Sequence, residues 1–168
     1  MEVIIRNITK DKEETLDLPM NILKLEEILG NDEFIIVDAE KVIPVSTYYS
    51  IIEINTFLEN CMENDVYEDD LAVLAKAGYT FDEIRNMVED GSYIIIDFTN
   101  ETAGWSSADI YSDYDKGLCL QTSGYAELPF KYDDSMEDYI SWEKVWFDAD
   151  GNGWRTARHD YHDYIVHA

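Results

Sequence analysis

Apolar residues recur every three to four positions in four segments of the chain, which is the spacing of one buried face of an α-helix. These segments are residues 18–30, 50–61, 80–91 and 135–147, and a short acidic helix that ends at Gly78 is expected at residues 67–78. The first of them has a proline near its start and a glycine as its last residue, an asymmetry that helices prefer. The pattern therefore predicts a helix in each segment.

Two of the expected helices begin with a capping box, in which Ser or Thr is followed three residues later by Glu. Ser50 with Glu53 and Thr80 with Glu83 fit this pattern, and Gly91 is the natural end of the second of these helices. Reciprocal hydrogen bonds between the two side chains and the backbone are expected at both helix starts.

The last expected helix has two alternative starts, one of them Asp134 with Glu137 and the other Ser135 with Asp138. Four apolar or aromatic residues share its buried face: Met136, Tyr139, Ile140 and Trp146. The region before it is less regular, where 106–115 is compatible with a helix and 117–121 with a short strand.

Short runs of β-branched and apolar residues, typical of strands, alternate with these helices. They cover residues 3–8, 33–45, 92–98, 154–158 and 161–166. The order of the elements predicts an α+β fold with at least two separate β segments and a helix-rich middle.

The composition is that of a globular chain. Its 168 residues are 46% hydrophobic and 13% aromatic, which is ample for a packed core. No stretch approaches the roughly 18 apolar residues of a membrane span, and the first residues lead into a strand without a signal-peptide pattern. Cys61 and Cys119 lack CxxC spacing and are expected to be free thiols in a reducing compartment, the cytoplasm.

Acidity changes this picture more than any motif does. The chain has 37 Asp and Glu against 12 Lys and Arg, a net charge of −25 at pH 7. Such a surface argues against binding DNA, RNA or anionic lipid, because those ligands are held by Lys and Arg. It favours a partner with a basic surface. The alternative is an acidic surface that serves only solubility or a halophilic habitat.

The acids are also unevenly placed. Residues 59–115 hold 15 acidic residues against two basic ones, and residues 125–150 hold eight against two. Few basic side chains are therefore available to neutralise the expected helices through pairs three or four residues apart.

Residues 148–159 begin like a calcium-binding EF-hand loop, with Asp148, Asp150 and Asn152 at the first three ligand positions. The twelfth position, which needs a bidentate Glu, is His159. A helix end followed by a turn explains the same Asp-Gly-Asn-Gly run. We expect the helix end and no calcium site.

Zinc binding by His159, His162 and His167 is disfavoured for a similar reason. Side chains three apart on one strand point to opposite faces, so His159 and His162 are not expected to converge, and no cysteine lies at ligand spacing. The sequence also lacks the GxSxG, HExxH, Walker A and GxGxxG motifs, and we expect no enzymatic activity.

The 12 tyrosines and four tryptophans are numerous for one modest core, and several lie between acidic residues. They are compatible with half-buried amphipathic rings. They are equally compatible with a protein-binding surface, where Tyr and Trp are favoured anchors.

Four segments, in this order, resemble the ArdA antirestriction proteins, acidic DNA mimics of conjugative elements and phages. Residues 18–32 (LPMNILKLEEILGND) resemble the family's first helix and its Gly-Asn-Asp turn, and 35–59 resemble its strand, bend and second helix. Residues 80–96 (TFDEIRNMVEDGSYIII) and 124–154 resemble the later motifs. The resemblance covers most of the chain but not residues 99–124.

The resemblance implies an elongated, curved molecule of three modules. These would be an N-terminal α/β module (1–62), a helical middle module (63–103) and a C-terminal α/β module (104–168) that dimerises. Duplex DNA carries one charge per about 1.7 Å, so a net charge of 25 corresponds to roughly 40 Å of duplex. A basic DNA cleft would be occupied by such a charge array without any base readout.

The function implied is a non-enzymatic inhibitor of bacterial DNA-targeting defence. It would act as a homodimer, without a cofactor or metal, on the DNA-binding surface of a Type I restriction–modification complex, and would bind neither nucleic acid nor membrane. The acids expected to imitate phosphates are Glu63, Asp65, Glu68, Asp69, Asp70, Asp82, Glu83, Glu89, Asp90, Asp133, Asp134, Glu137, Asp138, Glu143 and Asp148. Three further residues match the family's motif near the dimer contact: Glu127, Leu128 and Pro129.

Other readings of the acidity stay open. The same decoy could be directed at a CRISPR effector or another defence nuclease. An acidic immunity or adaptor protein that neutralises one basic toxin would instead need a single localised patch with an aromatic anchor. A calcium-binding regulator is the third alternative.

Overall fold

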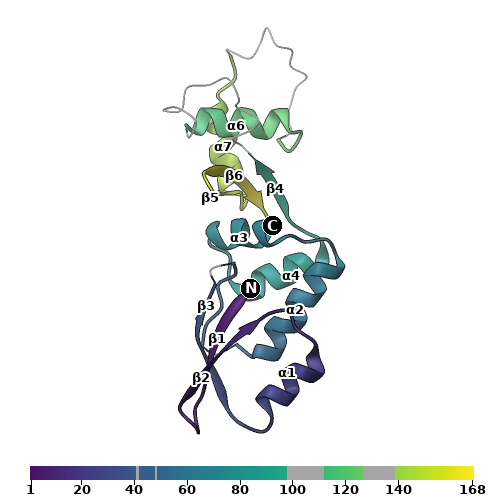
Figure 1. Cartoon of the computed structure of the whole chain (residues 1–168). Helices are drawn as coiled ribbons and strands as arrows, with labels where there is room; N and C mark the ends of the chain where they lie inside the picture. Colours follow the sequence, from purple (N-terminus) through teal and green to yellow (C-terminus); the bar gives the residue numbers. More distant parts are fainter. Residues whose placement is uncertain (41, 48, 98–111, 127–138) are drawn as a thin grey trace. The chain divides into compact units, whose positions relative to one another are not determined.

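Two small antiparallel sheets, each accompanied by helices, make up the α+β fold (Figure 1). A computed structural model describes residues 1–168 apart from 41, 48, 98–111 and 127–138. The chain forms two compact units, Met1–Gly91 and Ser92–Ala168. Among the described residues, no helix is long and apolar enough to cross a membrane.

The sheet of the first unit has the strand order β2-β1-β3, and both pairings are antiparallel. Buried positions alternate with exposed or half-buried ones along its central strand β1, and the side chains of Val3 and Ile5 are fully buried. The strand bounds are β1 Glu2–Asn7, β2 Lys12–Asp17 and β3 Phe34–Ala39.

The sequence does not indicate strand β2, because its KEETLD run buries one residue only, Leu16. The other five side chains are exposed, as an edge strand allows. Pairing with β1, from Glu2 opposite Asp17 to Asn7 opposite Lys12, supplies the order that apolar burial does not.

The described residues of the first unit form four helices, and all four were predicted from the sequence. Each buries one face, which includes Leu25 in α1, Phe57 in α2, Leu74 in α3 and Ile84 in α4. The helix bounds are α1 Ile22–Leu29, α2 Ile51–Glu63, α3 Glu68–Lys76 and α4 Phe81–Asp90.

Only one of the two expected capping boxes forms. The Thr80 backbone N–H donates to Glu83 Oε2 at 2.7 Å, and the Glu83 N–H donates to Thr80 Oγ1 at 3.3 Å. The box predicted for Ser50 and Glu53 is wrong, because the Ser50 side chain makes no capping hydrogen bond. Burial of Ile51, rather than a capping bond, stabilises the start of α2.

The sheet of the second unit has the order β4-β6-β5 and is antiparallel throughout. The two helices of this unit, among the described residues, are α6 and α7. The bounds are β4 Ile94–Asp97, α6 Asp113–Thr122, α7 Trp142–Asp150, β5 Arg155–His159 and β6 His162–His167.

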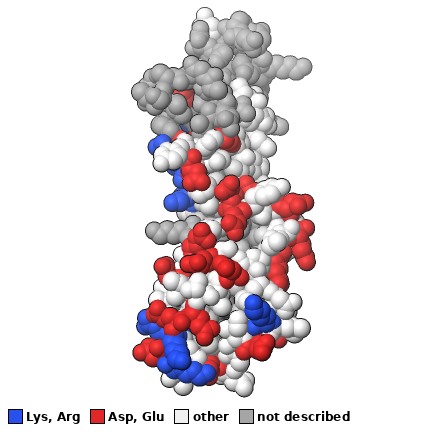
Figure 2. Space-filling view, viewed as in Figure 1, with Lys and Arg blue, Asp and Glu red and all other residues white. Residues whose placement is uncertain are grey.

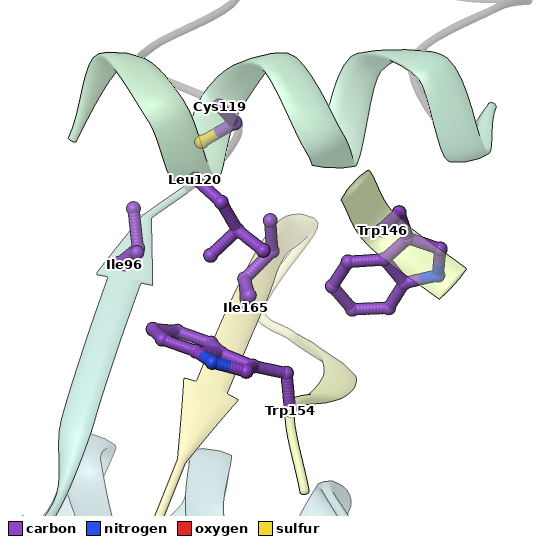
Figure 3. Close-up of a cluster of buried hydrophobic side chains, with 6 residues drawn as sticks. All are labelled: Ile96, Cys119, Leu120, Trp146, Trp154 and Ile165. Carbon is purple, nitrogen blue, oxygen red and sulfur yellow. The ribbon is translucent and has the colours of Figure 1, made fainter. Parts of the chain in front are cut away.

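The core of the second unit joins both helices to the sheet (Figure 3). Leu120 from α6 and Ile165 from β6 point towards each other in its centre, and both are buried. The remaining members of the cluster come from β4, α6, α7 and the residue just before β5: Ile96, Cys119, Trp146 and Trp154. Full burial of a side chain such as Ile165 contributes about 1.5–3 kcal/mol.

Two predictions for this unit are wrong. Residues 117–121, expected to be a strand, lie within α6. Helix α7 begins at Trp142 after the cap residue Ser141, not near residue 135, and Tyr139 lies outside it with 86% of its surface exposed. The alternative helix starts at 134–138 fall outside the described residues.

In the described part of the chain neither Cys61 nor Cys119 is in a disulfide, as predicted, and both are buried. Burial raises the pKa of the Cys61 thiol to about 12. Residues 63–91, assigned above to a middle module, lie within the first unit. The three-module division stays a prediction.

Candidate functional site: an acidic helical surface

Eleven of the predicted acidic residues lie among the described residues. Nine are on or between α2, α3 and α4 in the first unit, and Glu143 and Asp148 are on α7 in the second. Seven predicted residues fall outside the described part: Glu127, Leu128, Pro129, Asp133, Asp134, Glu137 and Asp138. We call the nine acids of the first unit the acidic helical surface: Glu63, Asp65, Glu68, Asp69, Asp70, Asp82, Glu83, Glu89 and Asp90.

These nine carboxylates face solvent, and eight of them are exposed. Asp70 is partly buried, and desolvation raises its pKa above the ordinary value of 3.8. On the face drawn in Figure 2, acidic side chains spread over the first unit, while most of its basic side chains gather near the β1–β2 hairpin. The surface therefore presents negative charge to any approaching partner.

Two of the basic residues near the hairpin form ion pairs. Arg6 binds Glu13 and Lys10 binds Asp32. The hydrogen bond from Lys10 lowers the pKa of Asp32, and the bond to Glu13 raises the pKa of Arg6. These cations neutralise one acid of β2 and one of the loop between α1 and β3, and they leave the helical surface negative.

Five of the nine carboxylates lie in the first turn of a helix. They are Glu68, Asp69 and Asp70 in α3, and Asp82 and Glu83 in α4. A negative charge there interacts favourably with the helix dipole, by about 0.3–1 kcal/mol each. Local helix stability alone accounts for these five acids.

Some first-turn acids also have direct partners. Asp82 accepts a hydrogen bond from the Tyr49 hydroxyl at 3.3 Å and forms an ion pair with Arg85 at 3.0 Å. Glu68 lies 3.4 Å from the amino group of Met1. The pKa of Tyr49 is raised, first by burial and then by the charge of Asp82. These contacts reduce the charge that α3 and α4 present at their N-termini.

Three other carboxylates lie where a helix disfavours them. Glu63 is in the last turn of α2, and Glu89 and Asp90 are in the last turn of α4. Neither turn contains a basic residue. The negative end of the helix dipole repels a carboxylate by about 0.3–1 kcal/mol, so these three together cost roughly 1–3 kcal/mol. Local stability gives no reason for them.

Asp65 is placed even less favourably. It follows α2 with a φ of 56°, the left-handed conformation that glycine adopts without strain. The Val66 N–H donates to the Cys61 carbonyl at 2.9 Å and so closes a Schellman-type end of the helix. At the end of α4 the left-handed position is taken by Gly91, with a φ of 61°. An aspartate at residue 65 therefore carries both a conformational and an electrostatic cost.

The two described candidates of the second unit repeat this contrast. Glu143 lies in the first turn of α7, where a carboxylate is favourable, and accepts a hydrogen bond from Ser141 Oγ at 3.4 Å. Asp148 lies in the last turn of α7, which again has no basic residue. Both are exposed.

The residues that resembled an EF-hand loop form a helix end and a turn, as expected. Helix α7 runs through Asp150, and the Asn152 side-chain amide donates to the Asp148 carbonyl at 2.6 Å. Gly153 has a φ of 96° in the turn that follows. The Asp-Gly-Asn-Gly run thus ends α7 through backbone chemistry.

The expectation for the histidines is corrected. His159 and His162 do not lie on one strand, because a two-residue turn at 160–161 separates β5 from β6 and makes the two histidines cross-strand partners. Their side chains therefore share a face. His162 Nδ1 lies 3.0 Å from Asp97, whereas His167 lies at the other end of β6 near the Asn152 carbonyl.

A groove on the first unit was not visible in the sequence. It has a volume of about 470 Å³ and is lined by one face of α2 and one face of α4, including Glu53, Phe57 and Glu89. A second hollow of about 350 Å³ lies beside β3 and the end of α3. Neither could be found without the tertiary arrangement of the helices.

No protein-family model matches the chain, and no curated protein sequence matches it either.

Proposed function

We propose that this protein is an acidic DNA mimic that inhibits a bacterial DNA-targeting defence complex. Its carboxylates would occupy the Lys- and Arg-lined DNA cleft in place of phosphates. The proposed target is the DNA-binding site of a Type I restriction–modification enzyme, because the order of the sequence motifs resembles that of the ArdA proteins. Inhibition would need no catalysis by this chain.

The observation that carries the proposal is the placement of carboxylates at the C-terminal ends of helices. Glu63, Glu89 and Asp90 oppose the helix dipole, and Asp65 adds a left-handed backbone. Total stabilities of small domains are about 5–15 kcal/mol, so a cost of several kcal/mol is a substantial fraction. Selection for external charge explains acids at these positions, whereas helix stability does not.

Solubility alone is a weaker explanation for the same residues. A soluble surface needs a net charge well away from zero, but it does not need carboxylates at the sites where they lower the stability of the fold most. Binding to a partner with basic groups at fixed positions does require carboxylates at particular sites. Long-range attraction between this surface and a basic cleft would also raise the association rate and make it sensitive to salt.

The remaining features of the proposal follow from the family resemblance. The molecule would be elongated and curved, would consist of three modules and would form a homodimer through its C-terminal module. In that arrangement the acids of two chains would extend over about 80 Å of imitated duplex at one charge per 1.7 Å.

Competition tests the proposal. The protein would be titrated into a Type I enzyme bound to labelled duplex, at low and at high salt. We expect displacement of the duplex at low salt and a marked loss of potency at high salt. Absence of displacement at low salt, or displacement that is equally potent at low and high salt, would refute the mechanism for that target.

A matched pair of variants shows whether position matters in addition to net charge. One variant carries four neutralising changes on the acidic helical surface: Glu63→Gln, Asp65→Asn, Glu89→Gln and Asp90→Asn. The control carries four changes at exposed acids of β2 and α1: Glu14→Gln, Asp17→Asn, Glu26→Gln and Glu27→Gln. We expect the first variant to displace duplex at least about tenfold less well than the control, which corresponds to about 1.4 kcal/mol. Equal potency would contradict a role for these positions.

A further inference from the structure

The groove between α2 and α4 combines apolar and acidic walls. Ile52 is 39% exposed at its rim, and the side chain of Phe57 lies beneath with 3% exposed. Glu53 in the first turn of α2 and Glu89 in the last turn of α4 add carboxylates, both exposed. The other lining side chains, apart from Arg85, are uncharged and polar.

This combination suits a long cationic side chain. Lys and Arg lay an apolar stem along hydrophobic surface while the charged head reaches a polar or acidic partner. Carboxylates accept charge-assisted hydrogen bonds from such a head, and these are roughly twice as strong as neutral ones. A purely apolar ligand would leave the two carboxylates without a partner from the ligand, and an anion would be repelled.

Arg85 also lines the groove, but its guanidinium already forms an ion pair within α4. Its guanidinium lies 3.0 Å from Asp82 and 5.8 Å from the centre of the Phe81 ring. In the described part of the chain, no ion pair joins Arg85 to Glu53 or Glu89. The groove therefore keeps a negative balance from its two carboxylates.

We propose that the α2/α4 groove is an anchor site for one arginine or lysine side chain of a basic partner protein. This inference rests on the proposed function for the identity of the partner, and it adds a defined contact to an otherwise diffuse attraction. Glu53 and Glu89 would bind the cationic head, and Ile52 with Phe57 would pack against the stem. One partner side chain would then fix the register of the acidic helical surface on the cleft.

Direct binding of a labelled oligo-arginine peptide tests the groove without any defence enzyme. The test variant is Glu53→Gln with Glu89→Gln, and the control is Glu26→Gln with Glu27→Gln on α1, which removes the same charge from exposed sites. We expect the groove variant to weaken peptide binding about tenfold and the control about twofold or less. Equal weakening by both pairs would overturn the proposal.

Two further measurements separate the contributions. Ile52→Ser should weaken binding of the peptide by about threefold, because the change removes an apolar contact and no charge. Amide chemical shifts should change mainly in α2 and α4 when peptide is added, and shifts spread evenly over the unit would overturn a defined site. Thermal unfolding of each variant checks that the fold is intact.

The two proposals fail differently. If the unaltered protein does not displace duplex from the Type I enzyme, the proposed function fails, while selective loss of peptide binding still supports the groove. If displacement occurs and both neutralised pairs bind peptide equally well, the groove proposal fails and the charge-based function stands.

Discussion

Replacing Asp65 with glycine should make the protein more stable. Asp65 has a φ of 56° after α2, where an L side chain is strained, and its carboxylate lies beside the negative end of that helix. The left-handed conformation costs about 1 kcal/mol, and the charge costs about 0.3–1 kcal/mol at low salt. Asp65→Gly removes both terms, and we expect a gain of about 1–2 kcal/mol. In a unit of this size, each kcal/mol of added stability should raise the Tm by about 4–8 °C.

Two companion variants divide the gain into its parts. Asp65→Asn removes the charge but keeps a side chain, so it should gain about 0.5 kcal/mol, and this gain should vanish in high salt. Gly91→Asp places an aspartate in the left-handed position that ends α4, where a new Cβ meets nothing within 4 Å. That variant should lose about what Asp65→Gly gains.

Urea denaturation at fixed pH, in low and high salt, measures all three changes. The reasoning is refuted if Asp65→Gly is no more stable than the unaltered protein, or if Gly91→Asp is tolerated without loss. The same Asp65 variants should displace duplex less well from the proposed target. An aspartate kept against its own stability cost is expected where external charge is selected.

Three further predictions concern other parts of the chain. Gly117→Ala should destabilise the second unit by about 1–3 kcal/mol, because the new Cβ would lie 2.0 Å from the Trp142 carbonyl oxygen. Helix propensity alone would instead stabilise the unit by about 1 kcal/mol. A higher Tm for the variant would therefore contradict the close packing of Gly117 against Trp142. Asp32→Asn should lower the free energy of unfolding near neutral pH, because the pKa of Asp32 is below 3.8 in the folded chain. The stability that the Asp32 carboxylate contributes is present above pH 3.8 and is lost as the pH falls through the pKa of the folded chain. Denaturation curves of the variant and the unaltered protein should therefore converge in acid. Cys61, with its pKa raised to about 12, should not react with a thiol reagent near neutral pH until denaturant is added, and rapid labelling of the folded protein would contradict its burial.

The helices of the first unit could be predicted because their apolar spacing and their ends agree. Thr80 and Glu83 form the box that their spacing indicates, and Gly91 ends α4 as expected. Strand β2 could not be predicted, because its only buried side chain is Leu16 and its order comes from pairing with β1. Local pattern predicts elements that bury a face of their own.

Helix α6 shows the opposite failure. Its Gly117-Leu118-Cys119-Leu120 run is short and apolar, which is ambiguous between helix and strand. Contact with α7 decides the matter, since Gly117 lies against the Trp142 backbone and Leu120 is buried in the core below. Because Gly117 has no side chain, the backbone of α7 can approach α6 closely at this point. The sequence alone does not indicate which element packs against this glycine.

The candidate site was predictable in kind but not in detail. Exposed carboxylates are a safe expectation for so acidic a chain, yet the sequence could not show which of them oppose a helix. That distinction depends on α2 ending at Glu63, which puts Asp65 in the left-handed position. The groove between α2 and α4 depends on helices whose residues are about 30 positions apart in the sequence.

The cost of each carboxylate separates two explanations of acidity that net charge cannot distinguish. If acids had accumulated for solubility alone, they would concentrate in first turns, where Asp82 and Glu83 stabilise α4. Glu89 and Asp90 occupy the last turn of the same helix, with no basic residue beside them. Helix α4 therefore carries acids at both ends, and these acids stabilise its N-terminal end and destabilise its C-terminal end. This pattern is expected of a scaffold that displays negative charge along its whole length, because such a display requires acids at the unfavourable end as well.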